Sequence, residues 1–213
     1  METKEDLINL LIAAGYLKSP LLIEAFKEID RKDFLPEEIK ERAYENSALA
    51  IGNKQTISQP LVVVFMQELL ELKNGEKVLE IGTGSGWQTA LMAKLVGESG
   101  LPGQGKIISI ERITGLNEFA KKNLLKYGFV EKGIIELLVA DGSKGYGAAA
   151  PYDKIISAAS GKEIPEIWKE QLKIGGRIVA PVKNSIVVLD KTAADKFEKK
   201  EYFGFSFVPL IVD

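Results

Sequence analysis

Residues 78–86 constrain the fold of this chain more than any other stretch. They read Val-Leu-Glu-Ile-Gly-Thr-Gly-Ser-Gly, an apolar run followed by glycines at positions 82, 84 and 86. A helical pattern of apolar residues begins directly afterwards, at Trp87. This order predicts a buried parallel strand, a tight turn and a crossover helix. Glycines let such a turn adopt positive φ and let a ligand lie against the backbone, and the helix start offers unpaired N–H groups.

The spacing of the glycines separates two kinds of ligand. A dinucleotide site has the pattern G-x-G-x-x-G, whose third glycine packs the helix against the strand. Counted from Gly82, that sixth position is Trp87, which is far too large. The pattern here is E-x-G-x-G-x-G, which resembles motif I of the S-adenosylmethionine-dependent methyltransferases. Glu80 would then be favourable near the ammonium group of the methionine part. The alternative is a glycine turn that merely joins a strand to a helix.

Composition narrows the chemistry that the chain can perform. Its 213 residues are enough for one α/β domain. Its net charge is −2, whereas a typical nucleic-acid-binding protein has an excess of basic residues. The chain has no cysteine and no histidine, so thiolate nucleophiles, cysteine-ligated metals and the usual general base are excluded. We therefore expect no metal. The charged N-terminus and the lack of an apolar run near ~20 residues predict a cytoplasmic protein without membrane contact.

Strand and helix patterns alternate through the rest of the chain. Further strands are predicted at 106–111, 134–139, 152–160 and 177–182, and two more at 185–189 and 200–208 should form an antiparallel edge. Helices are predicted at 61–70 and 116–127, and a glycine-rich loop at 97–105. The alternation predicts an α/β fold, with one Rossmann-like, doubly wound and mostly parallel sheet.

The N-terminal segment, residues 1–45, is predicted to be helical, with short helices at 5–14 and from Ser19-Pro20. Its apolar residues are too few for an independent core. We therefore expect a single methyltransferase-type domain over residues 1–213, composed of this flank, a loop at 46–60 and a core at 61–213.

Acidic residues follow two of the predicted strands. Glu111 ends the second strand, where a carboxylate can accept hydrogen bonds from both ribose hydroxyls of a nucleoside, as in dinucleotide folds. Asp141-Gly142 follows the third strand, where a side-chain oxygen and a backbone N–H can hold adenine. The alternatives are a solvated strand end for Glu111 and a simple turn for Asp141-Gly142.

Residues 49–60 are polar and rich in turn formers, which predicts an exposed loop before the apolar helix at 61–70. Ser58 lies just before that helix, and Pro60 lies in its first turn. Ser58 is either an N-cap or, with free N–H groups at the helix start, part of a corner that binds a carboxylate. The two interpretations are compatible. Small residues after the fourth strand, at Ala158 and Ala159, would leave space for a substrate.

The stretch from Ile51 to Pro60, Ile-Gly-Asn-Lys-Gln-Thr-Ile-Ser-Gln-Pro, resembles a loop with the core G-x-x-Q-T-I-S-x-P. That loop is typical of the protein-L-isoaspartate O-methyltransferases, a family of class I methyltransferases. Residues 78–86, 141–146 and 150–153 support the resemblance. It extends from about the second helix to Pro209.

The resemblance implies a repair enzyme that uses S-adenosyl-L-methionine. Such enzymes methylate the free carboxylate of L-isoaspartyl residues in damaged proteins; the ester then cyclises to a succinimide, which can reopen to aspartate. Ser58 matches the active-site serine of the family, within a predicted substrate-binding set of Gln55, Thr56, Ile57 and Ser58. The predicted cofactor-binding residues are Glu80, Gly82, Thr83, Gly84, Gly86, Glu111, Arg112, Asp141 and Gly142. The expected partners are isoaspartyl-containing proteins and peptides, without nucleic acid, and we expect a monomer.

The chain departs from the family pattern in two places. Asn53 and Lys54 stand where the family often has histidine, and Trp87 stands where a tyrosine is common. The sequence also ends at Asp213, so contacts from a longer family tail cannot be carried over.

The chemistry fits a chain without histidine. A carboxylate is already ionised at pH 7 and needs no general base, and a sulfonium is a good leaving group. Ser58 is therefore expected to orient the carboxylate; as a nucleophile it would need an activating base. Two alternatives stay open: a class I methyltransferase with a small-molecule or RNA acceptor, and a non-catalytic module that binds S-adenosylmethionine.

Overall fold

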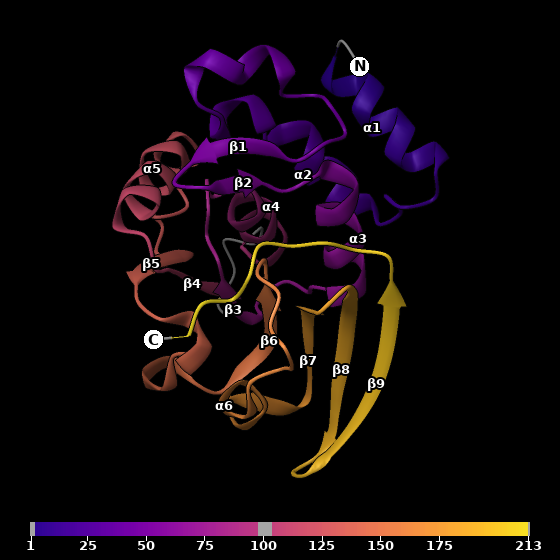
Figure 1. Cartoon of the computed structure of the whole chain (residues 1–213), viewed down its shortest axis with the longest axis vertical. Helices are drawn as coiled ribbons and strands as arrows, with labels where there is room; N and C mark the ends of the chain where they lie inside the picture. Colours follow the sequence, from indigo (N-terminus) through magenta and orange to yellow (C-terminus); the bar gives the residue numbers. More distant parts are fainter. Residues whose placement is uncertain (1–2, 98–103, 213) are drawn as a thin grey trace.

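The computed structural model of the chain describes residues 3–97 and 104–212, so most of the loop predicted at 97–105 lies outside the described residues. A seven-stranded sheet with the order β5-β4-β3-β6-β7-β8-β9 forms its centre (Figure 1). The first five strands in this order, from β5 through β3 to β7, are parallel, and β8 and β9 add an antiparallel edge. The predicted Rossmann-like, mostly parallel sheet is confirmed. The strands are β3 (Lys77–Ile81), β4 (Lys106–Glu111), β5 (Ile135–Val139), β6 (Tyr152–Ser157), β7 (Leu172–Val182), β8 (Ser185–Ala193) and β9 (Lys196–Phe203).

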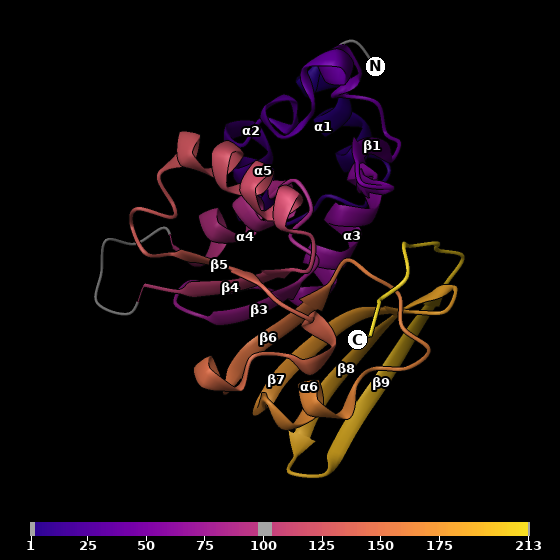
Figure 2. The same ribbon diagram turned by 60° about the vertical axis from the view of Figure 1, so that its left-hand side comes forward.

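Helices cover both faces of the sheet. On one face lie α3 (Pro60–Leu70), α4 (Trp87–Val96) and α5 (Thr114–Leu124), and on the other lies the short α6 (Glu166–Glu170) (Figure 2). The period-two alternation of a strand sends Val78 into the first apolar cluster and Leu79 into the second. Both faces of the central strands are thus buried, which explains their continuous apolar sequences.

The N-terminal segment packs on the face that carries α4. It contains α1 (Lys4–Ala13), α2 (Pro20–Glu28) and two 3-10 turns, η1 (Arg31–Phe34) and η2 (Glu37–Arg42). Phe26 of α2 packs edge-on against Trp87, with 5.4 Å between the ring centroids. Ser19 occupies the N-cap position of α2, but its hydroxyl donates to Glu68 instead of capping the helix.

The prediction of an exposed loop at residues 49–60 is wrong. Residues there form an antiparallel hairpin of β1 (Leu49–Gly52) and β2 (Gln55–Ile57). Its two-residue tip, Asn53-Lys54, has φ of 52° and 58°, the left-handed backbone that a type I′ turn requires. The inward side chains at 49, 51 and 57 are buried. The turn formers that suggested a loop therefore make only the tip of the hairpin.

The C-terminal segment also differs from the prediction. The last strand ends at Phe203, whereas the sequence predicted a strand to 208. Residues 204–212 then leave the sheet edge and return across the front of β6 (Figure 1). Backbone hydrogen bonds fix this return, since Ser160 N–H donates to Val208 O and Leu210 N–H donates to Ser160 O, both at 2.8 Å. The segment thereby reaches the centre of the molecule.

Candidate active site

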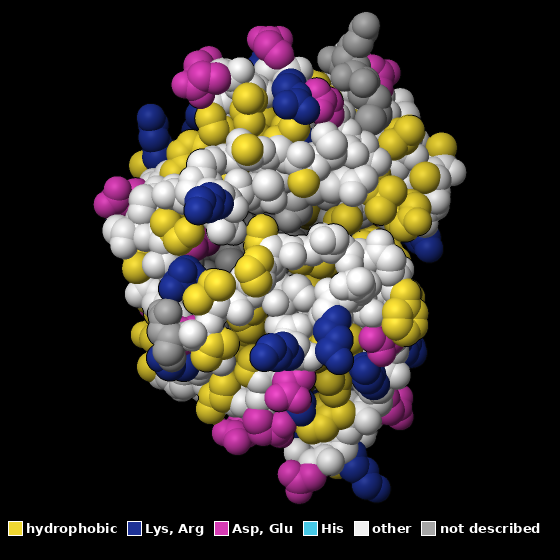
Figure 3. Space-filling view, in the orientation of Figure 1, with side chains coloured by type: hydrophobic (Ala, Val, Ile, Leu, Met, Phe, Trp, Pro, Cys, Tyr) yellow, Lys and Arg dark blue, Asp and Glu magenta, His cyan; other side chains and the backbone are white. Residues whose placement is uncertain are grey.

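The carboxyl ends of the central strands open into one large cavity. Strands β4 and β6 lie on opposite sides of β3, so crossovers diverge there, and open α/β sheets bind ligands at such a point. The cavity measures about 430 Å³ and is bordered by the turn after β3, the β1–β2 hairpin and the C-terminal segment. In Figure 3 a furrow lined by uncharged and hydrophobic side chains crosses the middle of this face.

The glycine turn after β3 forms one wall of the cavity. Gly82 and Gly84 line it, and Gly82 has a φ of 91°. Gly86 does not line it: a Cβ there would lie 3.2 Å from Leu124 Cγ of α5, so this glycine allows close packing of the turn on that helix. Thr83 borders a small adjoining hollow and is paired with Ser109 at 2.6 Å.

Glu111 reaches the cavity from the end of β4. Its side chain is buried, with Oε2 accepting from Gly84 N–H and Oε1 from Ile113 N–H, both at 3.0 Å. An ionised carboxylate has about four acceptor positions, so each oxygen keeps capacity for a ligand hydroxyl. Arg112 also lines the cavity. The structure therefore brings both residues to the cavity.

Asp141 and Gly142 take different positions. Gly142 lines the cavity and packs so tightly on β3 that a Cβ would lie 2.6 Å from Ile81 Cγ2. Asp141 does not line it. Its Oδ1 accepts from the backbone N–H of Ser143 at 2.9 Å, which caps the 3-10 turn η4 (Gly142–Lys144). Asp141 thus shapes the backbone that presents Gly142.

Glu80 lies beneath the glycine turn and does not line the cavity. It is fully buried and accepts hydrogen bonds from Gln88 at 3.1 Å and from Thr89 and Ser109 at 2.6 Å. Burial raises the pKa of Glu80 to about 7, against the opposing effect of these three hydrogen bonds. Because it joins β3 to β4 and to the first turn of α4, its visible contacts support the turn and not a ligand.

The β1–β2 hairpin and the start of α3 form the opposite wall. Gln55, Thr56 and Ser58 line the cavity, whereas the Ile57 side chain is buried beside it. The N-cap interpretation of Ser58 is wrong, because the N-cap position of α3 belongs to Gln59. The first turn of α3 is instead capped from a distance, with Leu61 N–H donating to Asn46 Oδ1 at 3.0 Å.

Several lining residues were not predicted. The main group is the C-terminal segment, which contributes Ser206, Phe207, Val208, Pro209, Leu210 and Ile211. Gly204 was a usable signal, because it lies inside the predicted strand, has a φ of 96°, and follows directly after the last residue of β9. The small residues Ala158 and Ala159 do line the cavity, as predicted.

Two further properties bear on the chemistry of the site. Within residues 3–97 and 104–212, no three acidic side chains lie close enough together to hold a metal ion. Over the same residues, every helix is too short or too polar to cross a lipid bilayer.

Comparisons with known proteins agree on one family. Residues 2–213 match the profile described as "Protein-L-isoaspartate(D-aspartate) O-methyltransferase". A protein-L-isoaspartate O-methyltransferase from Ignicoccus hospitalis is 44% identical, over 99% of this chain and 98% of that protein. Another from Methanopyrus kandleri is 41% identical, over 98% of this chain and 91% of that protein.

Solved structures show the same fold. A Plasmodium falciparum structure, described as a β-aspartate methyltransferase in complex with S-adenosyl-L-homocysteine, superimposes with a TM-score of 0.87 at 22% identity. The match covers 99% of both chains. A second structure, a protein-L-isoaspartate O-methyltransferase, has a TM-score of 0.81 at 28% identity, over 97% of this chain and 65% of that one.

Proposed function

The chain belongs to the protein-L-isoaspartate(D-aspartate) O-methyltransferase family, and on that premise we propose a reaction and a role for each wall of its cavity. The reaction is transfer of the methyl group of S-adenosyl-L-methionine to the free carboxylate of an L-isoaspartyl residue. One observation carries the proposal: a single cavity is bordered by the glycine turn on one side and by Gln55, Thr56 and Ser58 on the other. A methyl donor and an acceptor can therefore meet in it.

The glycine turn side fits the cofactor. A volume of about 430 Å³ lies in the range of ~300–1,000 Å³ typical of small-molecule sites. The bare backbone of Gly82 and Gly84 can approach the methionine part, and Glu111 has acceptor capacity for the ribose hydroxyls. Gly142 would lie along the adenine ring. We assign Gly82, Gly84, Glu111 and Gly142 to cofactor binding. The residues that do not line the cavity would stabilise the backbone around them, namely Glu80, Thr83, Gly86 and Asp141.

The hairpin side fits the acceptor. Ser58 would donate its hydroxyl hydrogen to the isoaspartyl carboxylate and hold one oxygen in line with the methyl group, with Gln55 and Thr56 beside it. When bound, S-adenosylmethionine would supply an electrophilic methyl carbon: the carboxylate oxygen would form the new C–O bond while the C–S bond breaks and its electron pair stays on sulfur. No proton moves in this step. Alignment and the exclusion of water are therefore what the chain supplies.

The expected partners follow from the same geometry. Thr56 of the acceptor wall is exposed and Gln55 and Ser58 are half-buried, so the isoaspartyl residue of a protein or peptide can reach this wall from the surface. The net charge of −2 gives no electrostatic reason for nucleic-acid binding. We propose that the protein acts as a monomer, because one chain can supply both the cofactor side and the acceptor side of the cavity.

One assay tests the proposal. Purified protein is incubated with S-adenosylmethionine labelled in its methyl group, and with either an isoaspartyl peptide or its aspartyl twin. We expect base-labile label in the isoaspartyl peptide alone. Equal labelling of the isoaspartyl and aspartyl peptides would show that the protein does not distinguish the isoaspartyl carboxylate from that of ordinary aspartate. Calorimetric binding of S-adenosylhomocysteine without labelling of either peptide would point to a non-catalytic module or to a different acceptor.

A further inference from the structure

Arg31 joins the two ends of the β1–β2 hairpin. It lies on the 3-10 turn η1, only 2% exposed, and its terminal nitrogens donate to four backbone carbonyls. Nη1 contacts the oxygens of Ala43 and Glu45 at 2.8 and 3.0 Å, and Nη2 contacts those of Ser47 and Ser58 at 2.9 and 3.1 Å. The first three carbonyls precede β1, and that of Ser58 directly follows β2. One guanidinium therefore closes the base of the hairpin.

Among the residues that the structure describes, no carboxylate forms a hydrogen bond or an ion pair with Arg31. Burial lowers its pKa to about 10, an effect that the negative charge of Glu45 opposes, so the guanidinium stays protonated at neutral pH. The Glu45 carboxylate itself is engaged by Arg42 at 2.8 Å and by Ser47 Oγ at 3.1 Å. Arg31 also lies 5.2 Å from the centre of the Trp87 ring, at the start of α4. Its contacts thus link the hairpin base to the helix that follows the glycine turn.

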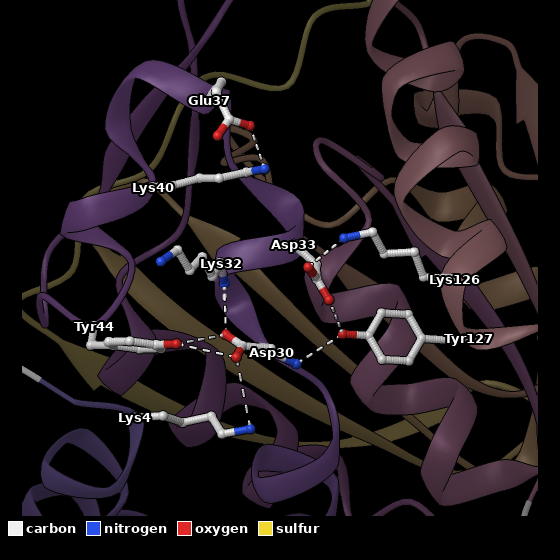
Figure 4. A network of polar contacts seen from close by, with 9 residues as sticks. All are labelled: Lys4, Asp30, Lys32, Asp33, Glu37, Lys40, Tyr44, Lys126 and Tyr127. Carbon is white, nitrogen blue, oxygen red and sulfur yellow. Dashed lines mark hydrogen bonds and ion pairs between the residues drawn. The ribbon is translucent and has the colours of Figure 1, made fainter.

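The turn that carries Arg31 is anchored on its other side. Asp30 and Asp33 flank Arg31, and Figure 4 shows both reaching Tyr127, which follows α5. The Tyr127 hydroxyl accepts from Asp30 N–H at 2.9 Å and donates to Asp33 Oδ2 at 2.8 Å. Lys126 pairs with Asp33 as well. The backbone of η1 is therefore fixed to the 3-10 turn that directly continues α5, the helix that packs against Gly86.

We propose that Arg31 is a positioning residue for acceptor binding, an inference that rests on the proposed function. The turn that carries Arg31 is anchored to Tyr127, and the guanidinium lies against Trp87, so the position of Arg31 depends on the half of the fold that would bind the cofactor. Its hydrogen bonds to four carbonyls in turn fix the position of the Ser58 backbone. Asn46 extends the effect, because it lies between two of the held carbonyls and caps Leu61 N–H at the start of α3. Both the serine and the helix start that would face the carboxylate depend on one side chain.

The geometry requires arginine and not merely a cation. A planar guanidinium presents five donors in a fixed fork, which serves carbonyls arriving from two directions. A lysine ammonium has three donors and can satisfy at most three of the four carbonyls at once. Methionine fills similar volume and satisfies none. Wild type, Arg31→Lys and Arg31→Met therefore form a series in which fewer and fewer of the four carbonyls can be hydrogen-bonded. None of these side chains leaves a large cavity.

Lys191 of β8 provides a matched control. It is 8% exposed and also donates to backbone carbonyls, those of Lys169 at 2.7 Å and Leu172 at 2.9 Å. These contacts lie away from the cavity lining. Lys191→Met therefore removes a buried cation from its carbonyls without touching the hairpin, and it reports the general cost of such a loss.

The test measures three quantities for the wild type and the three variants. They are kcat and KM for an isoaspartyl hexapeptide, the Kd of S-adenosylhomocysteine by calorimetry, and hydrogen exchange of amides in residues 49–62. For Arg31→Met we expect kcat/KM to fall about 100-fold through both constants, with Kd changed less than about threefold, because only the acceptor wall is released. Arg31→Lys should recover about tenfold of that loss. Hairpin amides should exchange at least about tenfold faster in Arg31→Met alone.

The outcomes separate the two claims. If Arg31→Met matches Lys191→Met in kcat, KM and hairpin exchange, the positioning role is refuted and Arg31 only stabilises the fold. A wild type that fails to methylate the isoaspartyl peptide refutes the proposed function, while hairpin exchange still decides whether Arg31 fixes the Ser58 wall. Should Arg31→Met not fold, Arg31→Lys carries the same comparison.

Discussion

Replacing Glu111 by glutamine should weaken cofactor binding while leaving the fold intact. In the structure the two carboxylate oxygens accept from the backbone N–H groups of Gly84 and Ile113, both at 3.0 Å. Glutamine keeps the shape but replaces one acceptor oxygen by an NH₂ donor. That NH₂ group must face one of the two N–H donors, so one of them loses its partner and the bound ribose loses a charged acceptor.

The magnitude follows from these contacts. A hydrogen bond to a charged group contributes about 1.5–3 kcal/mol, and every 1.4 kcal/mol is about tenfold in Kd. Losing the charged ribose contact should therefore raise the Kd of S-adenosylhomocysteine about 10- to 150-fold. The N–H that is left without an acceptor should lower the free energy of unfolding by about 1–3 kcal/mol.

Calorimetric titration with S-adenosylhomocysteine and denaturant unfolding measure the two effects. Glu68→Met serves as the stability control, because a single oxygen of Glu68, Oε1, accepts from the backbone N–H groups of Lys18 and Ser19, both at 2.8 Å, and methionine fills a similar volume without any acceptor oxygen. Glu68 lies outside the cavity lining. It should lose stability without losing affinity. An affinity for Glu111→Gln within about twofold of the wild type would show that Glu111 does not hold the ribose.

Three further substitutions test other parts of the site. Ser58→Ala should lower kcat for an isoaspartyl peptide by about 10- to 100-fold with an unchanged Kd for S-adenosylhomocysteine, and full activity would remove its orienting role. Asp141→Ala removes the cap of η4, so it should cost about 0.5–2 kcal/mol in unfolding free energy and weaken cofactor binding; unchanged calorimetric affinity would contradict this. Because burial raises the pKa of Glu80 from 4.5 to about 7, the folded state binds more protons there, and this group should lower the unfolding free energy by about 3 kcal/mol as pH rises through that window. In Glu80→Gln that part of the pH dependence should vanish, and urea unfolding at pH 5 and 8 checks it.

The cofactor side of the cavity was largely predictable because its information is local. A strand, a glycine turn and a helix follow one another within residues 77–96, and parallel strands bring their carboxyl ends to one edge. This local order brings Gly82, Gly84 and Glu111 to the cavity. Glu80, Thr83, Gly86 and Asp141 do not line it, and for Glu80 the reason is strand periodicity. It shares a face of β3 with Val78, which is buried toward α4, so its side chain points under the turn.

The acceptor side was not predictable in the same way, because its information is spread along the chain. Apolar residues at 49, 51 and 57 are buried because the fold brings them into the first apolar cluster, which also contains residues of α2 and α4. Arg31 finds its carbonyl partners 12 to 27 residues further along. The C-terminal segment reaches the cavity through Ser160, about fifty residues upstream of its own position. Neither charge nor local periodicity records such pairings.

This division matches what the proposed chemistry demands. A carboxylate and a sulfonium bring their own charges and move no proton, so the site gains little from a tuned acid or base and depends on the distance and angle between two ligands. The two ligands are bound by walls that are far apart in sequence, and their relative position is set by whatever couples those walls. Arg31 is such a coupling: its neighbours Asp30 and Asp33 bind Tyr127, its guanidinium lies against Trp87, and it donates to the Ser58 carbonyl. In a chain without histidine, Arg31 can therefore contribute to methyl transfer by positioning the acceptor wall relative to the cofactor, although it does not touch the reacting atoms.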